Sequence, residues 1–191
     1  MLQARRIAAV LGERGVAHAF IGGLAVNAWS VPTPTYDIDL CASLAPEDVP
    51  SLVRRLEHDG FLPPPTTWLE SVGPAKFQEF TLHWAYGTRL RAADIFLATD
   101  PFQKEALSRS RVVELDIGFS TRVVVPEDLV IYKLLANRPK DRAAVERLLL
   151  LQTGLDLAYL WRWGRQFGIV NRLRDALGEA GYDPSTFPSS E

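Results

Sequence analysis

The chain has 191 residues, 47% hydrophobic and 23% charged, which is typical of one soluble globular core with room for a small appendage. A formal net charge of −2 excludes the strongly basic character that indicates a nucleic-acid partner, and leaves only local patches for such contacts. The single cysteine, Cys41, excludes an intramolecular disulfide framework and is typical of a reducing compartment. No apolar run approaches the ~18 residues that span a membrane, and the N-terminal segment lacks a signal-peptide core. We therefore expect a cytoplasmic protein with no membrane contact.

The first 42 residues predict, in order, a helix, a buried strand, a short Ala-rich helix and a second strand. These elements are expected at residues 1–14, 16–21, 24–29 and 36–42. Pro32 and Pro34 end the short helix and hold the chain extended as it enters the second strand.

The middle of the chain predicts a helix, an irregular loop and a β-hairpin. A proline followed by two acids is typical of a helix start, so we expect a helix over 46–60. The proline- and glycine-rich stretch 61–74 predicts an irregular surface loop. Apolar residues alternate imperfectly on either side of Gly87, which predicts two paired strands over 76–85 and 89–98.

The C-terminal part predicts a short helix, two more strands and then only helices. These elements are expected at 101–110, 112–115, 119–125, from 126 to a break at 137–139, and at 140–152, 156–167 and 170–180. We therefore expect an α/β (α+β) fold, with a small mixed sheet, helices on one face and a C-terminal helical cap that closes a cleft. The predicted parts are an α/β core over 1–125, a helical region over 126–182 packed on that core, and a frayed tail over 183–191.

Two aspartates and a glycine pair form the most distinctive pattern in the chain. Asp37 and Asp39 are two positions apart on a predicted strand, so their side chains share one face. Two carboxylates about 4 Å apart repel by roughly 4 kcal/mol at an effective dielectric near 20, so a cation between them would be stabilising. Gly22 and Gly23, which follow the preceding strand, would offer bare backbone N–H groups to a phosphate. This stretch predicts a metal–nucleotide site.

A third carboxylate, Asp94, lies inside an apolar stretch of a later predicted strand. A charged residue in such a strand usually points to solvent or to a partner rather than into the core. Three carboxylates from two neighbouring strands would hold two divalent cations ~3.5–4 Å apart, as in polymerase-type phosphoryl transfer, and magnesium suits such oxygen ligands. The alternative interpretation of Asp37 and Asp39 is two solvated acids at the rim of a sheet.

The order Gly22-Gly23, Asp37-Ile38-Asp39 and Asp94 resembles the minimal nucleotidyltransferase fold of the polymerase-β-like superfamily. Residues 21–26 and 36–40 look particularly like the AbiEii-type toxin nucleotidyltransferases and their bacterial relatives. The resemblance covers roughly residues 20–150 in order, and it implies an enzyme that moves an NMP from an NTP to a hydroxyl acceptor with two magnesium ions.

The resemblance also implies roles for the residues of the pattern. Gly22 and Gly23 would approach the triphosphate of the nucleotide. Asp37 and Asp39 would bind magnesium, and Asp94 would be the third metal ligand and the base for the acceptor hydroxyl.

Two further residues stand where the relatives often carry a helical lysine, a basic loop and an aspartate. By the resemblance, Lys133 would neutralise phosphate charge, and Asp141 would position or activate an acceptor group. Their alternative roles are an exposed helix residue for Lys133 and an N-terminal helix cap for Asp141. Arg138, Lys140, Arg142 and Arg147 form a basic cluster around Asp141, which either contacts a nucleic-acid backbone or is a solvated helix start.

The chain departs from its relatives just before the aspartate pair. They commonly carry an arginine there, whereas this chain has Thr33-Pro34-Thr35. Arg89 and Arg91 lie on the strand of Asp94 but alternate to its opposite face, so they are poor substitutes. A catalytically impaired relative that binds a nucleotide or a partner protein is therefore one alternative function.

A second alternative is the toxin component of a toxin–antitoxin pair that acts on tRNA and binds an antitoxin protein. The sequence leaves open whether the acceptor is RNA, protein or a small molecule. It also does not determine the preferred NTP or the oligomeric state.

Overall fold

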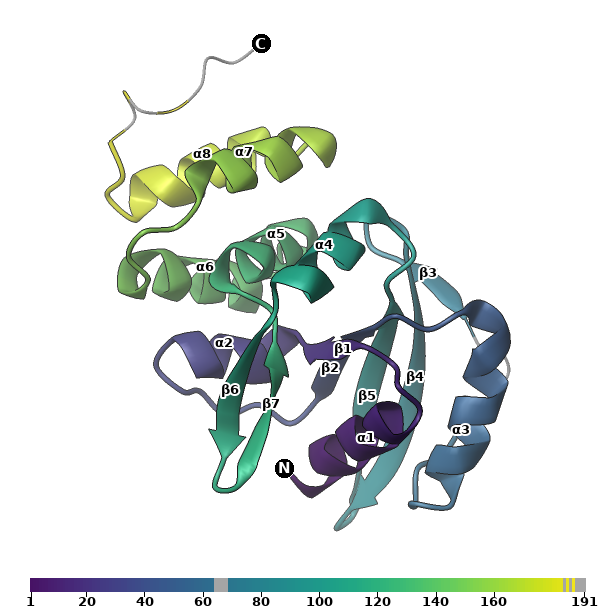
Figure 1. Ribbon diagram of the computed structural model, residues 1–191. Helices are drawn as coiled ribbons and strands as arrows, with labels where there is room; N and C mark the ends of the chain where they lie inside the picture. The colour runs from purple at the N-terminus through teal and green to yellow at the C-terminus, as the bar shows by residue number, and fades with distance from the viewer. Residues whose placement is uncertain (64–68, 184, 186, 188–191) are drawn as a thin grey trace.

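The computed structural model describes residues 1–63, 69–183, 185 and 187, and its centre is a mixed β-sheet (Figure 1). Within those residues the sheet has seven strands in the order β3-β4-β5-β2-β1-β7-β6. The strands are β1 (His18–Phe20), β2 (Ile38–Ala42), β3 (Glu70–Val72), β4 (Phe77–Tyr86), β5 (Arg89–Leu97), β6 (Arg111–Asp116) and β7 (Phe119–Val123). Two neighbouring pairs, β2 with β5 and β1 with β7, are parallel, and the other pairs are antiparallel. The predicted α/β class with a mixed sheet is confirmed.

Strand β2 is buried on both faces, because helices cover the sheet on both sides. Leu40 on one face and Cys41 on the other are both fully buried. The first residues of α1 (Leu2–Glu13) line a cavity with Ile38, on the face of Leu40. On the opposite face, Tyr132 of α5 (Pro126–Ala136) lies beside Cys41. The expectation of helices on one face only is therefore wrong, and buried residues on both faces of β2 are the pattern of a strand covered twice.

The remaining helices begin and end at residues that suit helix termini. They are α2 (Gly22–Trp29), the 3-10 turn η1 (Pro46–Asp48), α3 (Val49–Glu57), α4 (Pro101–Arg109), α6 (Pro139–Leu151), α7 (Leu157–Gln166) and α8 (Val170–Glu179). Asp100 caps α4 by accepting hydrogen bonds from the backbone N–H groups of Phe102 and Gln103. Asn137 adopts the left-handed conformation, with φ 51°, and ends α5 directly before α6. The helices predicted from the sequence are confirmed.

The β4–β5 hairpin is confirmed, but the predicted loop over 61–74 is partly wrong. Gly87 has φ +60° in the hairpin turn, a conformation that glycine adopts without strain. Within the predicted loop, Leu62 forms a bridge with His83, and Glu70–Val72 pairs with the edge of β4 as strand β3. An edge strand of three residues is too short to show an alternating pattern, so its proline-rich surroundings were the stronger signal. Residues 64–68 of that loop lie outside the described residues.

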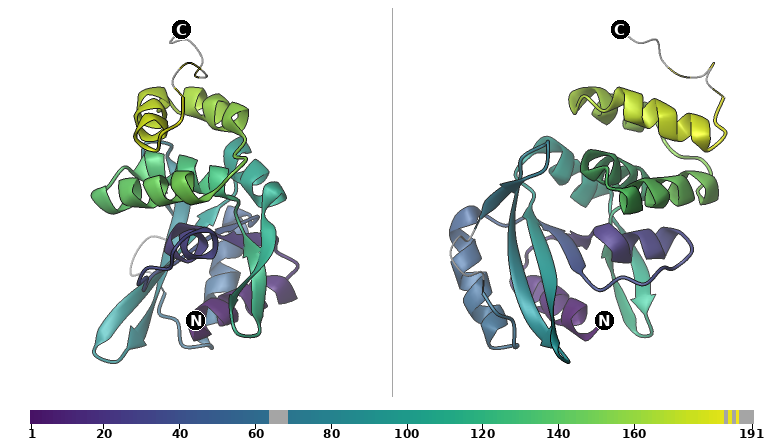
Figure 2. Two further views of the ribbon diagram at one scale, coloured as in Figure 1. Left: turned by 90° about the vertical axis from the view of Figure 1, so that its left-hand side faces the viewer. Right: turned by 180° about the vertical axis from the view of Figure 1, so that it is seen from behind.

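The helices form layers above the sheet, as Figures 1 and 2 show. Helices α5 and α6 lie next to the sheet, and α7 and α8 form the outermost layer. Aromatic side chains join α7 and the residue that follows it to α4, α5 and β4. The members of this aromatic cluster are Phe77, Phe102, Tyr132, Trp163 and Phe167, in ring contacts of 5.0–6.2 Å between centroids.

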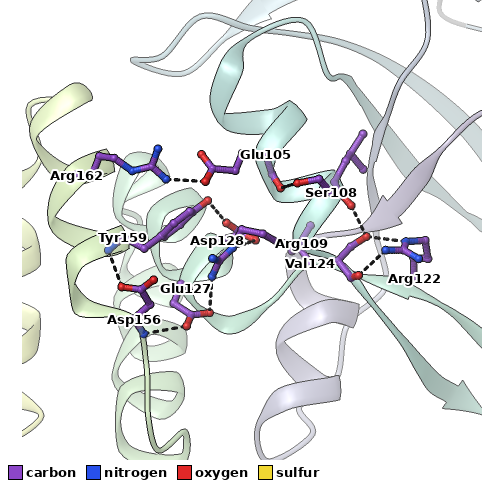
Figure 3. Close-up of polar contacts among 12 residues, drawn as sticks. Glu105, Ser108, Arg109, Arg122, Val124, Glu127, Asp128, Asp156, Tyr159 and Arg162 are labelled. Atoms are coloured by element: carbon purple, nitrogen blue, oxygen red, sulfur yellow. Dashed lines mark hydrogen bonds and ion pairs between the residues drawn. The ribbon is translucent and has the colours of Figure 1, made fainter.

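A buried polar cluster ties α4, α5 and α7 together (Figure 3). Arg109 lies over the ring of Tyr159, 3.9 Å from its centroid, and forms an ion pair of 3.3 Å with Glu127. The hydroxyl of Tyr159 donates a hydrogen bond to Asp128, whose side chain has no exposed surface. Burial raises the pKa of Asp128 to about 7, against the hydrogen bond from Tyr159 and the charge of Arg109, which lower it.

The sheet and helices share one hydrophobic cluster, which includes Leu40 of β2, Leu134 of α5 and Leu173 of α8. The division at residue 125 into a core and a helical region stays a prediction. Of the predicted tail, only 183, 185 and 187 belong to the described residues. In the described part of the chain, every helix is too short or too polar to cross a bilayer.

Candidate nucleotide and metal site

The glycine pair forms the first turn of α2 and packs directly against the aspartate strand. Gly22 has φ +62°, and a Cβ atom on it would lie 1.9 Å from Oδ2 of Asp39. A Cβ atom on Gly23 would lie 2.4 Å from Oγ1 of Thr35. The backbone N–H of Gly23 faces the Asp39 carboxylate and favours its charged form. Glycine is therefore required at both positions by the close approach of neighbouring side chains, and at Gly22 also by its backbone conformation.

Asp39 and Asp94 lie side by side on two parallel strands. They are register partners of β2 and β5, so their side chains project from the same face of the sheet. Thr81 of β4 is the register partner of Asp94 on the other side, and its hydroxyl donates a hydrogen bond of 2.7 Å to Oδ1 of Asp94. The convergence of Asp39 and Asp94 follows from this register. Thr81 was missed from the sequence because its role depends on the hairpin pairing.

Asp37 differs from the other two aspartates, because β2 begins only at Ile38. Asp37 is exposed and lies in the extended segment before the strand. Among the residues that the structure describes, no group of three or more histidine, cysteine or acidic side chains is close enough to hold a metal ion. Asp37, Asp39 and Asp94 as a joint metal site therefore stay a prediction.

The electrostatics of Asp39 indicate a position where a cation would be stabilising. Burial raises the pKa of Asp39 above its usual value, and the charges of Asp94 and Asp37 raise it further. Lys133 and the N–H group of Gly23 act in the opposite direction. Additional positive charge near Asp39 and Asp94 would relieve their mutual repulsion.

Lys133 and Arg138 are held together by Asp141, which is completely buried. Oδ1 of Asp141 lies 3.1 Å from Nζ of Lys133, and Oδ2 lies 2.6 Å from Nε of Arg138. Oδ2 also accepts a hydrogen bond of 3.2 Å from the backbone N–H of Arg138, so Asp141 caps α6 as well. Burial alone would raise the pKa of Asp141, but Arg138 and Lys133 outweigh it and hold the pKa below its usual value. Asp141 thus positions two cations beside Asp39 and Asp94.

Two cavities adjoin the carboxylates. The first, called the Lys133 cavity, has a volume of about 380 Å³ and lies between α2, the segment before β2, and α5–α6. Its charged lining residues are four acids and four bases: Asp37, Asp39, Asp94, Asp141, Lys133, Arg138, Lys140 and Arg147. Arg142, the remaining member of the predicted basic cluster, lines a different cavity with α8. The members of the predicted basic cluster thus line two different cavities.

The second cavity, called the Glu79 cavity, has a volume of about 370 Å³ and lies between the β3–β4 turn, strands β4 and β5, and the end of α5. It shares Asp39, Asp94 and Arg138 with the Lys133 cavity. Burial raises the pKa of Glu79 to about 7, and the charges of Asp94, Asp39 and Glu70 add to the shift. The sequence shows that Glu79 lies two residues before Thr81, so the two side chains share one face of a strand. That this face lies beside Asp94 could be known only from the register of β4 with β5.

The arginines on the hairpin do not supply the charge that the segment before Asp37 lacks. Arg91 stacks on Tyr36, 4.2 Å from the ring centroid, and lies 6.0 Å from the centroid of Tyr86. Arg89 is the register partner of Tyr86 near the hairpin turn, well before Asp94 on β5. The prediction that neither arginine reaches Asp94 agrees with these contacts.

No family model matches the chain, and no curated protein matches it. The solved structures that are similar in fold include the following three. The lincosamide antibiotic adenylyltransferase LnuA, lincomycin-bound, is 13% identical, with a TM-score of 0.55 over 78% of this chain and 96% of that one. The antibiotic-resistance factor ANT(2″)-Ia is 17% identical, with a TM-score of 0.54 over 93% and 94%. A putative nucleotidyltransferase from H. pylori is 13% identical, with a TM-score of 0.53 over 93% and 77%.

The chain therefore has a nucleotidyltransferase fold, as its glycine and aspartate pattern predicted. The finer likeness to the AbiEii-type proteins stays a prediction.

Proposed function

We propose that this protein is a nucleotidyltransferase that moves an NMP from an NTP to a hydroxyl acceptor. The observation that carries the proposal is the register of Asp39 with Asp94 on parallel strands. The turn of Gly22 and Gly23 lies on one side of the pair, and Lys133, held by Asp141, lines the same cavity. A glycine turn, paired carboxylates and a fixed lysine are groups that suit a metal-bound triphosphate.

In the proposed reaction the acceptor oxygen attacks the α-phosphorus of the NTP in line with the departing bridging oxygen. A new P–O bond forms as the bond to the β-phosphate breaks, pyrophosphate leaves with the electron pair, and the hydroxyl proton passes to the carboxylate of Asp94. The hydroxyl of Thr81 orients that carboxylate. Lys133 and Arg138 balance the negative charge of the leaving group, and Asp141 keeps both in place.

Two of the three proposed ligands, Asp39 and Asp94, present carboxylate oxygens on one face, which magnesium prefers, and burial destabilises the Asp39 anion in the absence of a cation. Asp37, Asp39 and Asp94 would hold two magnesium ions, which would neutralise charge on the phosphoryl oxygens. Because NTPs and magnesium are abundant in the cytoplasm, we assign the reaction to that compartment.

One of the similar structures is named as an antibiotic adenylyltransferase and another as an antibiotic-resistance factor, which favours a small molecule as the first acceptor class to test. The alternative of nucleotide binding without transfer draws on the exposed position of Asp37 and on Thr33-Pro34-Thr35, where the resemblance leads us to expect an arginine. The toxin role and an antitoxin partner stay predictions from the resemblance.

Incubation with each labelled NTP, magnesium and separated small-molecule, RNA and protein fractions of a cell lysate tests the proposal. We expect label transfer with the wild type and with Glu47→Gln, an exposed acid before α3 that serves as control. We expect none with Asp39→Asn or Asp94→Asn. Transfer that persists in both aspartate variants would overturn the assigned site. Magnesium-dependent NTP binding without any product would favour the non-catalytic alternative.

A further inference from the structure

The Lys133 and Glu79 cavities lie on two sides of the same carboxylates, which gives the site two distinct compartments. Both are lined by Asp39 and Asp94, but Gly23, Lys133 and Lys140 belong only to the first. A triphosphate in the first compartment would place its α-phosphorus near the shared carboxylates. The second compartment is then the open side from which an acceptor oxygen can approach in line.

The charges of the two compartments differ. The Lys133 cavity has as many bases as acids among its lining residues. The Glu79 cavity is lined by three acids, Asp39, Glu79 and Asp94, against the single base Arg138, whose guanidinium is bonded to Asp141. When Asp39 and Asp94 hold magnesium, Glu79 is the acid whose charge stays uncompensated in this cavity, so a cationic group would be attracted to it.

The remaining walls of the Glu79 cavity are largely apolar. Its apolar lining residues are Val72, Pro74, Ala75, Phe77, Phe96, Leu135 and Ala136. A volume of about 370 Å³ with this mixed lining lies in the range of small-molecule pockets rather than of a surface that receives a folded macromolecule.

Glu79 is the acid that belongs to the Glu79 cavity alone. It is the register partner of Phe96 and lies two residues before Thr81, so its side chain projects from the same face as Asp94. Glu79 forms no ion pair with any residue in the described part of the chain. Asp39 and Asp94 face the nucleotide side as well, so Glu79 is the carboxylate left for the acceptor.

We propose that the Glu79 cavity binds the acceptor, and that this acceptor is a small hydroxyl compound with an amine in its protonated form, which Glu79 binds as a specificity-determining residue. The apolar walls contact the carbon skeleton of the compound, and its hydroxyl oxygen lies beside Asp94. This assignment rests on the proposed function, because it takes the first compartment as the nucleotide site.

Calorimetry with a matched pair of probes tests the assignment. The glucosamine disaccharide carries two amines, and its N,N′-diacetyl counterpart has the same ring hydroxyls without the charge. Both are titrated into the full chain in the presence of magnesium and a non-hydrolysable ATP analogue. We expect the amine to bind the wild type at least about tenfold more tightly than the acetylated form, which is the effect of one charge-assisted hydrogen bond.

Glu79→Gln should abolish this preference, and Glu47→Gln should retain it. Equal binding of the two sugars, no binding of either, a preference that survives Glu79→Gln, or tighter binding of a single-stranded RNA oligonucleotide would each overturn the assignment. ATP–magnesium binding, measured separately in every variant, distinguishes the two proposals. Its absence from the wild type contradicts the proposed function, whereas its presence without an amine preference contradicts only the acceptor assignment.

Discussion

Gly22 and Asp39 are packed so closely that a Cβ atom on Gly22 would lie 1.9 Å from Oδ2 and 2.4 Å from Cγ of Asp39. The glycine thus does more than permit a turn, because the space that a side chain would occupy is filled by a carboxylate of the candidate site. The position of Asp39 and the identity of residue 22 depend on each other.

Gly22→Ala should therefore damage both stability and transfer. The left-handed backbone alone costs an alanine about 1–2 kcal/mol, and the overlap with Asp39 adds to it. Displacement of Asp39 by about 1 Å should lower the transfer rate roughly 100-fold. Gly87→Ala is the matched control, because Gly87 also has a positive φ but a Cβ atom added there would meet nothing within 4 Å. Thermal unfolding and transfer assays check both effects, and equal losses in the two variants would contradict the contact with Asp39.

Asp141→Asn should weaken the fold and nucleotide binding together, because it leaves Lys133 and Arg138 without their buried partner. Loss of one member of a buried ion pair costs about 3 kcal/mol. The pKa of Asp141 is held below its usual value, so its stabilisation is present above the unfolded pKa of about 3.9 and is lost as the pH falls through the lower folded value. Urea unfolding at pH 7 and pH 3 should show a large difference from wild type at pH 7 and a smaller one at pH 3.

Asp48→Asn, at an exposed acid before α3, is the control for charge removal and should leave both stability and ATP affinity unchanged. An Asp141→Asn protein that binds ATP as tightly as the wild type would contradict the positioning role of Asp141.

Local patterns in the sequence were sufficient to predict most elements of the fold. Proline with acids marks the start of α5, and glycine marks the β4–β5 turn, because both signals act within a few residues. Strand β3 could not be predicted, since a short edge strand is defined by its partner β4 rather than by its own residues. Burial of β2 on both faces was also missed, because the polar Asp39 interrupts the apolar run that would have indicated it.

Prediction of the candidate site from the sequence was limited in the same way, because local patterns do not reveal which strands pair. Gly22, Asp39 and Asp94 were found because their types and order form a recognisable pattern. Thr81 and Glu79 were not found, because their proximity to Asp94 depends on the register of β4 with β5, which joins residues 13 positions apart in the Thr81–Asp94 pair. The complete burial of Asp141 and its ion pairs with Lys133 and Arg138 could not be predicted either, because they depend on how α5 and α6 pack.

Asp128 should make the stability of the protein depend on pH between about 4 and 7. Its pKa is raised to about 7 in the folded state, so the folded state binds a proton that the unfolded state releases at about 3.9. The contribution of Asp128 to the free energy of unfolding is therefore fully present below pH 4 and is lost as the pH rises through 7. Asp128→Asn keeps an oxygen that can accept the hydrogen bond from Tyr159 and should flatten this decline.

Urea unfolding of wild type and Asp128→Asn at pH 5 and pH 7.5 checks the effect, with Glu47→Gln as control. Part of the slope should remain in the variant, because the pKa values of Asp39 and Glu79 are raised as well. An unchanged slope in Asp128→Asn would show that Asp128 does not titrate in this range.

Thr81→Val should impair transfer without impairing nucleotide binding. The substitution keeps the shape of the side chain but removes the hydroxyl that donates the 2.7 Å hydrogen bond to Asp94. A hydrogen bond to a charged group contributes about 1.5–3 kcal/mol, so the transfer rate should fall roughly 10- to 100-fold if Asp94 must be oriented to receive the proton. Thr88→Val, at an exposed position in the β4–β5 turn, is the matched control. Rate measurements at saturating NTP, with NTP affinity from calorimetry, separate the two effects. Because Thr81 is partly buried beside Asp94, a loss of NTP affinity with an unchanged rate would instead assign it to nucleotide binding.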